Sequence, residues 1–429
     1  MPLHILMVTS GLPHPATSGA AIRISQFARH LARRHRLTLL SYGGTAEQEP
    51  ANDLRAAGMN VVLVPAPSRS RKRATQMASL VSGRSHLGGI FHSRALQGAL
   101  ESLLPTGAFD AVVVEGSLLL RHRFPSGTPL VLDEHNLEFE VLERTAKIES
   151  SPLRRFFNSV EAAKFKREEL AAWRRADLCL FPSEREVQLV RILSPGTAAL
   201  AVANGVDLEY FRPQEGEIEP GSIVFIGTMG YRPNADAVHH LVRDILPRVH
   251  RLRPDAVLTV VGGGVPRSVQ RLAGPRVVVT GRVPDVRPFV GRAALMVAPL
   301  RIGGGTRLKV LEALAMGKAM VSTTLGCEGI AVKPGEHLAI ADDPQDFARE
   351  VVRLLDDPKA ATAMGARGRS LAERLYGWPV LTMEMERALE STVSRRGGDA
   401  ARHRSDSEPN GSPTSDESDQ SFRSLGSSY

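Results

Sequence analysis

The chain has 429 residues, of which 42% are hydrophobic and 23% charged, and this composition excludes collagen-like, coiled-coil and wholly disordered proteins. At about 150 residues per domain, the length favours two or three domains. The 54 basic and 46 acidic side chains give a formal net charge of +8, which favours phosphorylated substrates, acidic lipids or nucleic acid as partners without choosing among them.

The sequence carries no segment that would span a membrane or lead the chain out of the cell. It lacks the run of about 18 apolar residues that a membrane-spanning helix needs. The first residues read as a strand, without the charged start and cleavage site of a secretory leader. Cys179 and Cys327 lack the spacing of a zinc site or a disulfide framework. We therefore expect a cytoplasmic protein without a zinc site or a disulfide framework.

Short runs rich in Val, Ile and Leu alternate with longer helical patterns along most of the chain. This alternation is the signature of βαβ units around parallel sheets. The pattern breaks off after residue 182 and restarts near residue 223, so it predicts an α/β fold with two open sheets. Strands are expected at residues 4–9, 37–42, 61–64, 111–115, 130–133 and 178–182, and then at 223–227, 257–261, 277–280, 295–299 and 320–323.

Changes in composition mark the boundaries between these parts. A cluster of Pro and Gly among charged residues predicts a linker at residues 204–220. An N-terminal domain would then cover residues 1–203 and a C-terminal domain residues 221–376, followed by an amphipathic helix at 377–396. Residues 397–429 hold six acids, three Lys or Arg and almost no apolar side chains, so we expect a disordered tail there.

One stretch, R-I-G-G-G-T-R-L-K-V-L-E-A-L-A-M-G at residues 301–317, follows a predicted strand and opens a predicted helix. Gly303, Gly304 and Gly305 would let the backbone curl so that its N–H groups surround phosphate oxygens at a helix N-terminus. Thr306 would cap the helix or donate from its first turn. The segment therefore predicts an anion-binding loop.

The helix after this loop sorts its side chains onto two faces. Leu308 and Leu311 fall at i and i+3 and would be buried, which leaves Arg307, Lys309 and Glu312 off the buried stripe. Lys309 and Glu312 are neighbours on one face, so they can offer a cation to a phosphate and a carboxylate to sugar hydroxyls. The alternative is a solvent-facing ion pair worth roughly 0.2–0.5 kcal/mol. Such a surface helix would not need three glycines before it.

A second loop-to-helix junction follows the first predicted strand, at residues 10–23. Gly19 would let backbone N–H groups approach an anion at the helix N-terminus. An ordinary N-cap formed by Ser18, with Gly19 as a turn residue, explains the same residues equally well. Neither half of the sequence has the three-glycine dinucleotide fingerprint, which argues against a dinucleotide oxidoreductase.

The triple-glycine segment resembles the donor-binding loop and helix of the retaining nucleotide-sugar glycosyltransferases of family 4, which have the GT-B fold of two facing Rossmann-like domains. The likeness covers residues 4–394 in architecture and is most specific over residues 204–330. Further segments agree with the family in order and spacing: N-G-V-D at 204–207 with F-R-P at 211–213, I-G-T-M at 226–229, V-V-G-G at 260–263 and V-S-T-T-L-G-C-E-G at 321–329.

This resemblance implies that a sugar moves from a nucleoside diphosphate to an acceptor hydroxyl with retention of its anomeric configuration, in polysaccharide or glycolipid synthesis. The N-terminal domain would bind a carbohydrate or lipid-linked acceptor and the C-terminal domain the nucleotide sugar, with Glu312 holding the ribose hydroxyls. No metal or other cofactor is implied. The residues implied in donor binding are Gly19, Thr228, Arg232, Gly303, Gly304, Gly305, Thr306, Leu308 and Glu312, and those implied in catalysis are His135, Arg307 and Lys309.

The sequence departs from the family pattern in two places. The family has a second acid eight positions before the ribose-binding one, and Gly304 stands there instead, so the acid that contacts the transferred sugar is missing. The basic pair that usually follows the first strand of the second domain is replaced by Thr228 and by Pro233 or Asn234. A leaving diphosphate gains charge in the transition state and needs cations near it. Those still available are Arg232, Arg307 and Lys309.

His135 lies at the end of the strand segment L-V-L-D-E-H-N, residues 130–136, beside Asp133 and Glu134. The family resemblance implies a histidine here near the hydroxyls of the transferred sugar. A lone histidine is often bonded only to a neighbouring loop, so both interpretations stay open.

Two stretches concentrate positive charge: residues 68–73 (S-R-S-R-K-R) and residues 153–175. Each could lie on an anionic membrane surface at its inner face or meet a lipid-linked diphosphate, and each could equally be a solvated charged face. No base-reading module is visible, so nucleic acid is not expected. The competing functions are another GT-B activity, such as a nucleotide-sugar 2-epimerase or a phosphorylase, and a non-catalytic two-domain sugar-binding protein.

Overall fold

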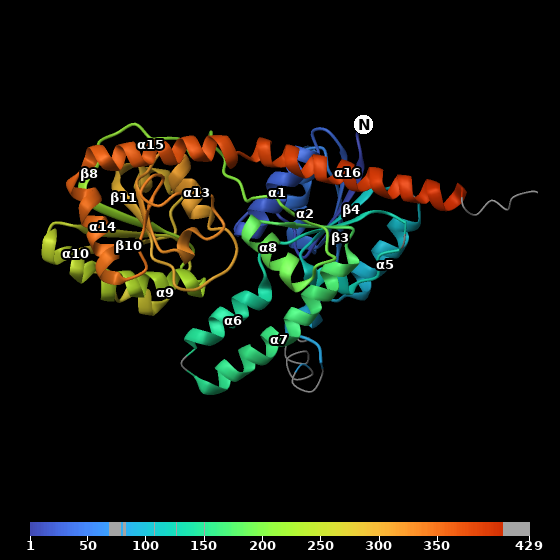
Figure 1. Cartoon of the computed structure of the whole chain (residues 1–429), viewed down its shortest axis with the longest axis horizontal. Helices are drawn as coiled ribbons and strands as arrows, with labels where there is room; N and C mark the ends of the chain where they lie inside the picture. The colour runs from blue at the N-terminus through green and yellow to red at the C-terminus, as the bar shows by residue number, and fades with distance from the viewer. Residues whose placement is uncertain (68–78, 80–82, 107, 126, 150, 406–429) are drawn as a thin grey trace, which may run out of the picture.

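The computed structural model of the chain describes residues 1–67, 79, 83–106, 108–125, 127–149 and 151–405. Two α/β domains lie side by side, each built on a parallel sheet with helices packed against it (Figure 1). The predicted fold class, two open parallel sheets in separate domains, is confirmed.

The first sheet has seven parallel strands in the order β3-β2-β1-β4-β5-β6-β7. The order reverses at β1, where Ile5 lies opposite Leu37 of β2 on one side and Ala111 of β4 on the other. Ligands of open α/β sheets bind outside the carboxyl ends of the strands at such a point. The strands are β1 (His4–Thr9), β2 (Arg36–Tyr42), β3 (Asn60–Val64), β4 (Ala111–Glu115), β5 (Leu130–Asp133), β6 (Leu178–Phe181) and β7 (Ala199–Ala201).

The second sheet repeats this arrangement with six parallel strands in the order β10-β9-β8-β11-β12-β13. Here the order reverses at β8, where Ile223 lies opposite Leu258 of β9 and Leu295 of β11. The strands are β8 (Glu219–Ile226), β9 (Val257–Val261), β10 (Val277–Gly281), β11 (Ala293–Ala298), β12 (Met320–Ser322) and β13 (Ala339–Ile340).

Helices connect successive strands in both domains. The first domain contains α1 (Gly19–Leu31), α2 (Gln48–Ala56), α4 (His86–Ile90), α5 (Arg94–Leu103), α6 (Glu138–Ile148), α7 (Pro152–Arg175) and α8 (Glu184–Leu193). The second contains α9 (Arg232–His240), α10 (Leu246–Leu252), α11 (Arg267–Gln270), α12 (Arg287–Arg292), α13 (Leu308–Ala315), α14 (Pro344–Asp356) and α15 (Pro358–Leu375), and α16 (Trp378–Ser405) follows. Short turns are 3-10 helices at Thr45–Glu47, Leu104–Thr106, Ser117–Arg121 and Leu325–Cys327 and a π-helix at Leu241–Ile245.

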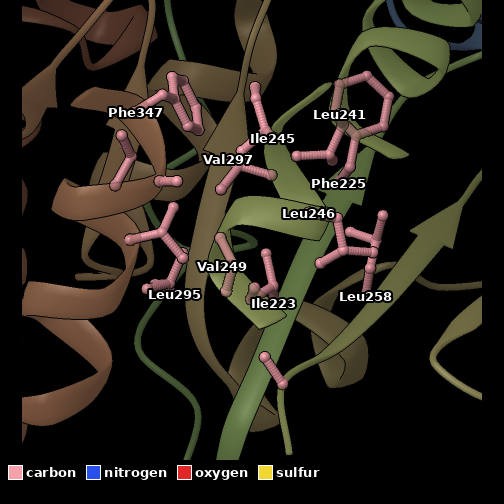
Figure 2. Packing of buried hydrophobic residues seen from close by; sticks show 14 of the residues in the cluster. Ile223, Phe225, Leu241, Ile245, Leu246, Val249, Leu258, Leu295, Val297 and Phe347 are labelled. Atoms are coloured by element: carbon pink, nitrogen blue, oxygen red, sulfur yellow. The ribbon is translucent and has the colours of Figure 1, made fainter. Parts of the chain in front are cut away.

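The strands of the second sheet are buried on both faces, which explains why they read as continuous apolar runs rather than alternating ones. On one face, Phe225 and Val297 pack with Leu241 and Phe347 of the covering helices (Figure 2). The residues next to them in the strands point to the opposite face, where α13 packs. Each large apolar side chain buried in this way contributes roughly 1.5–3 kcal/mol. Burial therefore fixes α13 against the sheet.

The last helix, α16, returns to the first domain and lies along it (Figure 1). Trp378 and Met385 are buried in the core of that domain, and the Trp378 ring meets the Phe27 ring edge-on at 5.4 Å. The helix runs to Ser405, so its expected end at residue 396 was nine residues too early, and the expected tail lies partly within it. Residues 406–429, the rest of that expected tail, lie outside the described residues.

Each predicted strand is present, within a few residues of its expected bounds. Two strands were missed, β7 with three residues and β13 with two, because runs so short have no measurable period. Strand β8 begins at Glu219, inside the expected linker.

Candidate active site

The carboxyl ends of the two sheets face each other, so that loops of the two domains touch. Thr306, after β11, donates from its hydroxyl to the Pro182 carbonyl, after β6, over 3.4 Å. The Leu308 side chain lies 3.7 Å from where a Cβ on Gly19 would stand. Helix α1 begins at Gly19. The hydroxyl of the preceding residue, Ser18, accepts a hydrogen bond from the backbone N–H of Ala21, as in an ordinary N-cap. The predicted residues of both domains therefore meet at one interface.

The triple-glycine loop follows β11 and requires its glycines. Gly303 and Gly305 have φ values of +126° and +66°, a region that side chains rarely adopt. A Cβ on Gly304 would stand 2.3 Å from Cγ2 of Val141 on α6, and one on Gly305 would stand 2.8 Å from the His135 carbonyl oxygen. The side chain of the family's missing acid has no room at Gly304 while α6 lies there.

Helix α13 begins at Leu308, with Arg307 and not Thr306 at the N-cap position, so the expected capping role of Thr306 was wrong. Arg307 is buried, and its guanidinium donates to the carbonyls of Gly304 and Gly305. Its Nη2 has no hydrogen-bond partner within the described ranges. Burial lowers the pKa of Arg307 from its usual value. Arg307 therefore fixes the triple-glycine loop through two of its carbonyls, and its Nη2 is left to donate to another group.

Lys309 reaches from α13 to the carboxyl end of β8. Its ammonium donates to Oδ1 of Asn234 over 2.6 Å and lies 4.3 Å from the centre of the Phe225 ring. A Cβ on Gly227, directly after β8, would stand 2.8 Å from this ammonium. Lys309 thus brings a cation to the strand end where the family's usual basic pair is missing.

Burial shifts both titratable groups of α13. It lowers the pKa of Lys309 to about 7, against the opposing effect of Glu312. It raises the pKa of Glu312 to about 7, against the opposing effect of Lys309. Because Lys309 bonds to Asn234, the two side chains are not the solvent-facing surface pair that the sequence left as an alternative. Nearby, the Asn234 amide donates to the Thr228 carbonyl over 2.9 Å, which ties the loop after β8 to Lys309.

An ion-pair network of side chains that sequence reasoning missed joins the domains beside this site. Arg144 of α6 donates to both carboxylate oxygens of Glu328, at 2.6 and 3.0 Å, and to the Gly303 carbonyl at 2.9 Å. Arg185 of α8 lies 3.1 Å from the same carboxylate. Directly after α6, its C-cap residue Glu149 pairs at 3.0 Å with Arg232, whose side chain is half exposed. The network closes the first domain onto the triple-glycine loop.

We expect Glu328→Arg to open the domains, because it places a third cation beside Arg144 and Arg185. Small-angle X-ray scattering should show a larger radius of gyration than in the wild type. Glu184→Arg, which breaks an exposed pair with Arg191 inside α8, is the matched control and should leave the radius unchanged. An unchanged radius in Glu328→Arg would show that the network does not hold the domains closed.

His135 lies in the loop after β5, next to acids at two strand ends. Its Nε2 lies 3.3 Å from Oε2 of Glu115, the last residue of β4. Glu115, Asp133 and His135 each have a possible metal-ligating atom within 4.8 Å of the others. Arg23 of α1, however, already donates to both carboxylate oxygens of Asp133, at 2.7 and 2.8 Å. Its guanidinium supplies the positive charge of this cluster, and we assign no metal there.

The second basic stretch is α7, and its side chains divide by position. Lys164 and Trp173 are buried, whereas Arg154 and Phe156 near its start are exposed. The first basic stretch, residues 68–73, lies outside the described residues. Among the described helices, none is both long and apolar enough to cross a bilayer.

Comparison with protein families matches both domains. A family described as "Glycosyl transferase 4-like domain" matches residues 18–205, and one described as "Glycosyl transferases group 1" matches residues 220–357. The chain belongs to the family 4 glycosyltransferases. The matches cover the second sheet with the triple-glycine loop and all strands of the first sheet except β1, so the family resemblance of the sequence is confirmed.

The sequences of named relatives match this chain over part of their length. The D-inositol 3-phosphate glycosyltransferase of Streptomyces bingchenggensis is 29% identical over 230 residues, which is 47% of this chain and 50% of that protein. The GDP-mannose-dependent monoacylated alpha-(1-6)-phosphatidylinositol monomannoside mannosyltransferase of Corynebacterium glutamicum is 30% identical over 209 residues, 44% of this chain and 55% of that protein. The match thus spans about half the length of these relatives.

Solved structures share the fold. The sucrose-phosphate synthase of Thermosynechococcus elongatus superimposes with a TM-score of 0.68 at 17% identity, covering 92% of this chain and 100% of that one. Anabaena HepE, solved in complex with UDP and glucose, does so with a TM-score of 0.64 at 13% identity, covering 91% of this chain and 100% of that one. The GT-B architecture is therefore established.

Proposed function

We propose that this chain transfers a sugar from a nucleoside diphosphate to an acceptor hydroxyl with retention of configuration, in polysaccharide or glycolipid synthesis. The observation that carries the proposal is Lys309 of α13, the helix that follows the triple-glycine loop, because its ammonium stands at the end of β8. A leaving diphosphate needs a cation and backbone donors at such a place.

The experiment begins with a thermal-shift screen of UDP, GDP and ADP, since a ligand that binds only the folded state raises the melting temperature. The matching nucleotide sugars are then incubated with simple glycoside acceptors, and the anomeric proton of the product is examined by NMR. An inverted product, or hydrolysis without transfer to any acceptor, would reject a retaining transferase. Because cations of the chain surround the loop, we propose that no metal is needed, and EDTA should leave the rate unchanged.

We assign the donor diphosphate to the triple-glycine loop, Gly19, Thr228 and Lys309, and the ribose to Glu312. At a pH above the Glu312 pKa of about 7, where the group is a carboxylate, replacing Glu312 by Gln should weaken binding of the nucleoside diphosphate by roughly tenfold. A hydrogen bond to a charged acceptor is worth about 1.5 kcal/mol at the low end. Calorimetry measures this directly. Glu373→Gln, on the exposed part of α15, is a control that should bind normally. Normal binding by both variants would leave Glu312 without a role in the donor site.

For the acceptor we propose a hollow of about 730 Å³ at the carboxyl ends of β1, β2 and β3. Leu12, His14, Tyr42 and Glu47 are among its lining residues. The loop that forms one wall continues into Gly19, which meets Leu308 of the donor domain. The names of two relatives contain inositol compounds. We therefore propose a polyol or a lipid-linked glycan as the acceptor class of this chain.

We further propose that the tip of the α6–α7 hairpin contacts an anionic membrane surface. This hairpin extends away from the first sheet (Figure 1). At its tip, Leu153 is 78% and Phe156 69% exposed, three positions apart on one face of α7. Lys147, Arg154 and Arg155 beside them are also exposed. Apolar side chains flanked by cations match the boundary between acyl chains and acidic headgroups.

Helix α6 links this tip to the active site. Its 11 residues span about 16 Å, from a start at the triple-glycine loop to an end beside Arg232. A membrane at the tip would therefore hold a lipid-linked acceptor near the mouth of the site.

Leu153→Ser/Phe156→Ser should weaken sedimentation with vesicles of phosphatidylcholine and phosphatidylglycerol by roughly tenfold or more, because each side chain contributes about 1.5–3 kcal/mol when buried. Ile192→Ser removes an equally exposed side chain on α8 and should sediment like the wild type. Pure phosphatidylcholine should bind little of any form. Equal sedimentation of the double variant and Ile192→Ser would contradict the membrane contact. A self-association of the wild type that the double variant abolishes would show that the exposed tip binds a second copy of the chain instead.

A further inference from the structure

The triple-glycine loop has few hydrogen-bond acceptors to offer a ligand. Arg144 already donates to the carbonyl of Gly303, and Arg307 donates to those of Gly304 and Gly305. What remains for a ligand is the backbone N–H groups, which only donate. A sugar bonded to a phosphate on this loop carries hydroxyl groups that also donate, so their acceptors must come from other parts of the chain.

The residues just before α6 lie against this loop from the first domain. Cβ of Asn136 is 3.7 Å from where a Cβ on Gly304 would stand and 3.4 Å from where one on Gly305 would stand. Because glycine has no side chain, Asn136 brings a polar side chain to these two positions. A sugar held next to the loop would therefore lie within reach of the start of α6.

Asn136 is bonded to an acid. Its Nδ2 donates over 2.9 Å to Oε1 of Glu138, the first residue of α6. The Glu138 side chain is partly exposed, and within the described ranges its Oε2 accepts no hydrogen bond. The amide therefore holds one carboxyl oxygen and leaves the other available to a ligand.

Glu138 differs from two other acids of this interface in its partners. Glu140 and Glu328 are each paired with both Arg144 and Arg185. No basic side chain in the described part of the chain forms an ion pair with Glu138. An acid at a domain interface without a cation is free to accept hydrogen bonds from hydroxyl groups.

The backbone at Glu138 is held in place by α7. The carboxylate of Glu169, which is completely buried, accepts from the N–H groups of Glu138 and Phe139 over 2.9 and 3.0 Å. Binding is stronger when the groups that recognise a ligand are fixed before it arrives. Glu169 and Asn136 together fix both the backbone and the carboxyl group of Glu138.

The second domain comes close to Glu138 at Tyr231, the N-cap residue of α9. Burial raises the pKa of the Tyr231 hydroxyl, the charge of Arg307 lowers it, and the charge of Glu138 raises it. An acid from α6 and a cation from the triple-glycine segment thus act on the same hydroxyl. This agrees with the contacts of Asn136 in placing Glu138 towards the loop.

We propose that Glu138, held by Asn136, accepts hydrogen bonds from hydroxyl groups of the sugar that is transferred. It is a specificity-determining residue that the first domain supplies, since Gly304 of the second domain has no side chain to offer. Burial raises the pKa of Glu138, but a carboxyl group accepts from a hydroxyl in either protonation state. The inference rests on the proposed function and extends it.

Calorimetry with matched ligands tests this assignment. The ligand pairs are UDP with UDP-glucose, GDP with GDP-mannose and ADP with ADP-glucose, and the pair whose nucleotide stabilises the wild type is used. Glu138→Ala should weaken binding of the nucleotide sugar by roughly tenfold, the size expected for one hydrogen bond to a charged group. Binding of the nucleoside diphosphate should not change, because it lacks the sugar. Glu143→Ala removes an exposed acid of the same helix and should bind both ligands normally.

The other outcomes separate this inference from the proposed function. An equal loss for both ligands in Glu138→Ala would show that Glu138 only shapes the loop, and normal binding of both would show that it does not contact the sugar. Either result overturns the role of Glu138 and leaves the donor site in the second domain. If none of the three nucleotides binds, the proposed function fails and this inference fails with it.

Domain opening provides a second measurement. Since Glu138 belongs to the first domain and the loop to the second, Glu138 can hold the sugar only when the domains are closed. A Glu328→Arg variant that scattering shows to be open should therefore lose the same roughly tenfold in binding of the nucleotide sugar. Adding Glu138→Ala to it should cost little more. A further tenfold loss in the double variant would contradict a contact made across the two domains.

Discussion

Lys309→Ala should lower kcat for sugar transfer by roughly 100-fold to 1000-fold, the usual consequence of removing one well-placed electrostatic contact in the transition state. The departing diphosphate carries more negative charge in the transition state than in the bound donor, so the loss should fall on kcat more than on donor binding. Lys309 lies at the end of β8 with Asn234 and the Phe225 ring, whereas the buried Arg307 guanidinium is held at the carbonyls of Gly304 and Gly305.

Two arginines serve as comparisons for this variant. Arg307→Ala should also lower kcat, because its guanidinium holds the carbonyls of the triple-glycine loop. Arg232→Ala should have a smaller effect, since that side chain is half exposed and paired with Glu149. Steady-state kinetics and calorimetry of the three variants decide the assignment. Near-normal turnover in Lys309→Ala together with a large loss in Arg232→Ala would contradict this assignment and place the diphosphate at the start of α9 instead.

Gly304→Ala should lower kcat/KM by roughly 100-fold, although it adds a single methyl group far smaller than the acid that the family has there. The new Cβ would overlap Cγ2 of Val141, at 2.3 Å, whenever α6 closes on the loop. Either the loop or α6 must then shift, and a displacement of about 1 Å in a catalytic arrangement can cost 100-fold in rate.

The same geometry specifies the rescue and the control. Val141→Ala removes the overlapping methyl group, so the double variant Gly304→Ala/Val141→Ala should recover much of the lost kcat/KM. Gly274→Ala adds a methyl group where nothing lies within 4 Å and should behave as the wild type. If the double variant is no better than Gly304→Ala, the close approach of α6 to the loop is not part of the working enzyme.

The fold could be predicted from the sequence because its information is local. Parallel strands buried on both faces read as continuous apolar runs, and β1, β4, β5 and β9 match their expected bounds residue for residue. The helical extension of α16 to Ser405 differs from the tail expected from composition. Gly397 and Gly398 disfavour a helix, but Ala400, Ala401 and the two arginines that follow favour one.

The triple-glycine loop was recognisable for the same reason, since its glycines, its cations and Glu312 lie within one segment. Contacts between distant segments were not. Nothing near Arg144 in the sequence points to Glu328, 184 residues away, because only the closure of two domains brings them together. A pairing that could have been found is Glu115 with His135, since both lie at the carboxyl ends of strands expected in one sheet.

The central claim is that the donor diphosphate lies between Lys309 and the triple-glycine loop. A crystal structure of the chain with the nucleoside diphosphate that stabilises it most tests this directly. We expect phosphate oxygens within hydrogen-bond distance of the Lys309 ammonium and of the backbone N–H groups of residues 303–306, with the ribose at Glu312. A nucleotide bound in the first domain instead, with Lys309 still bonded only to Asn234, would contradict it.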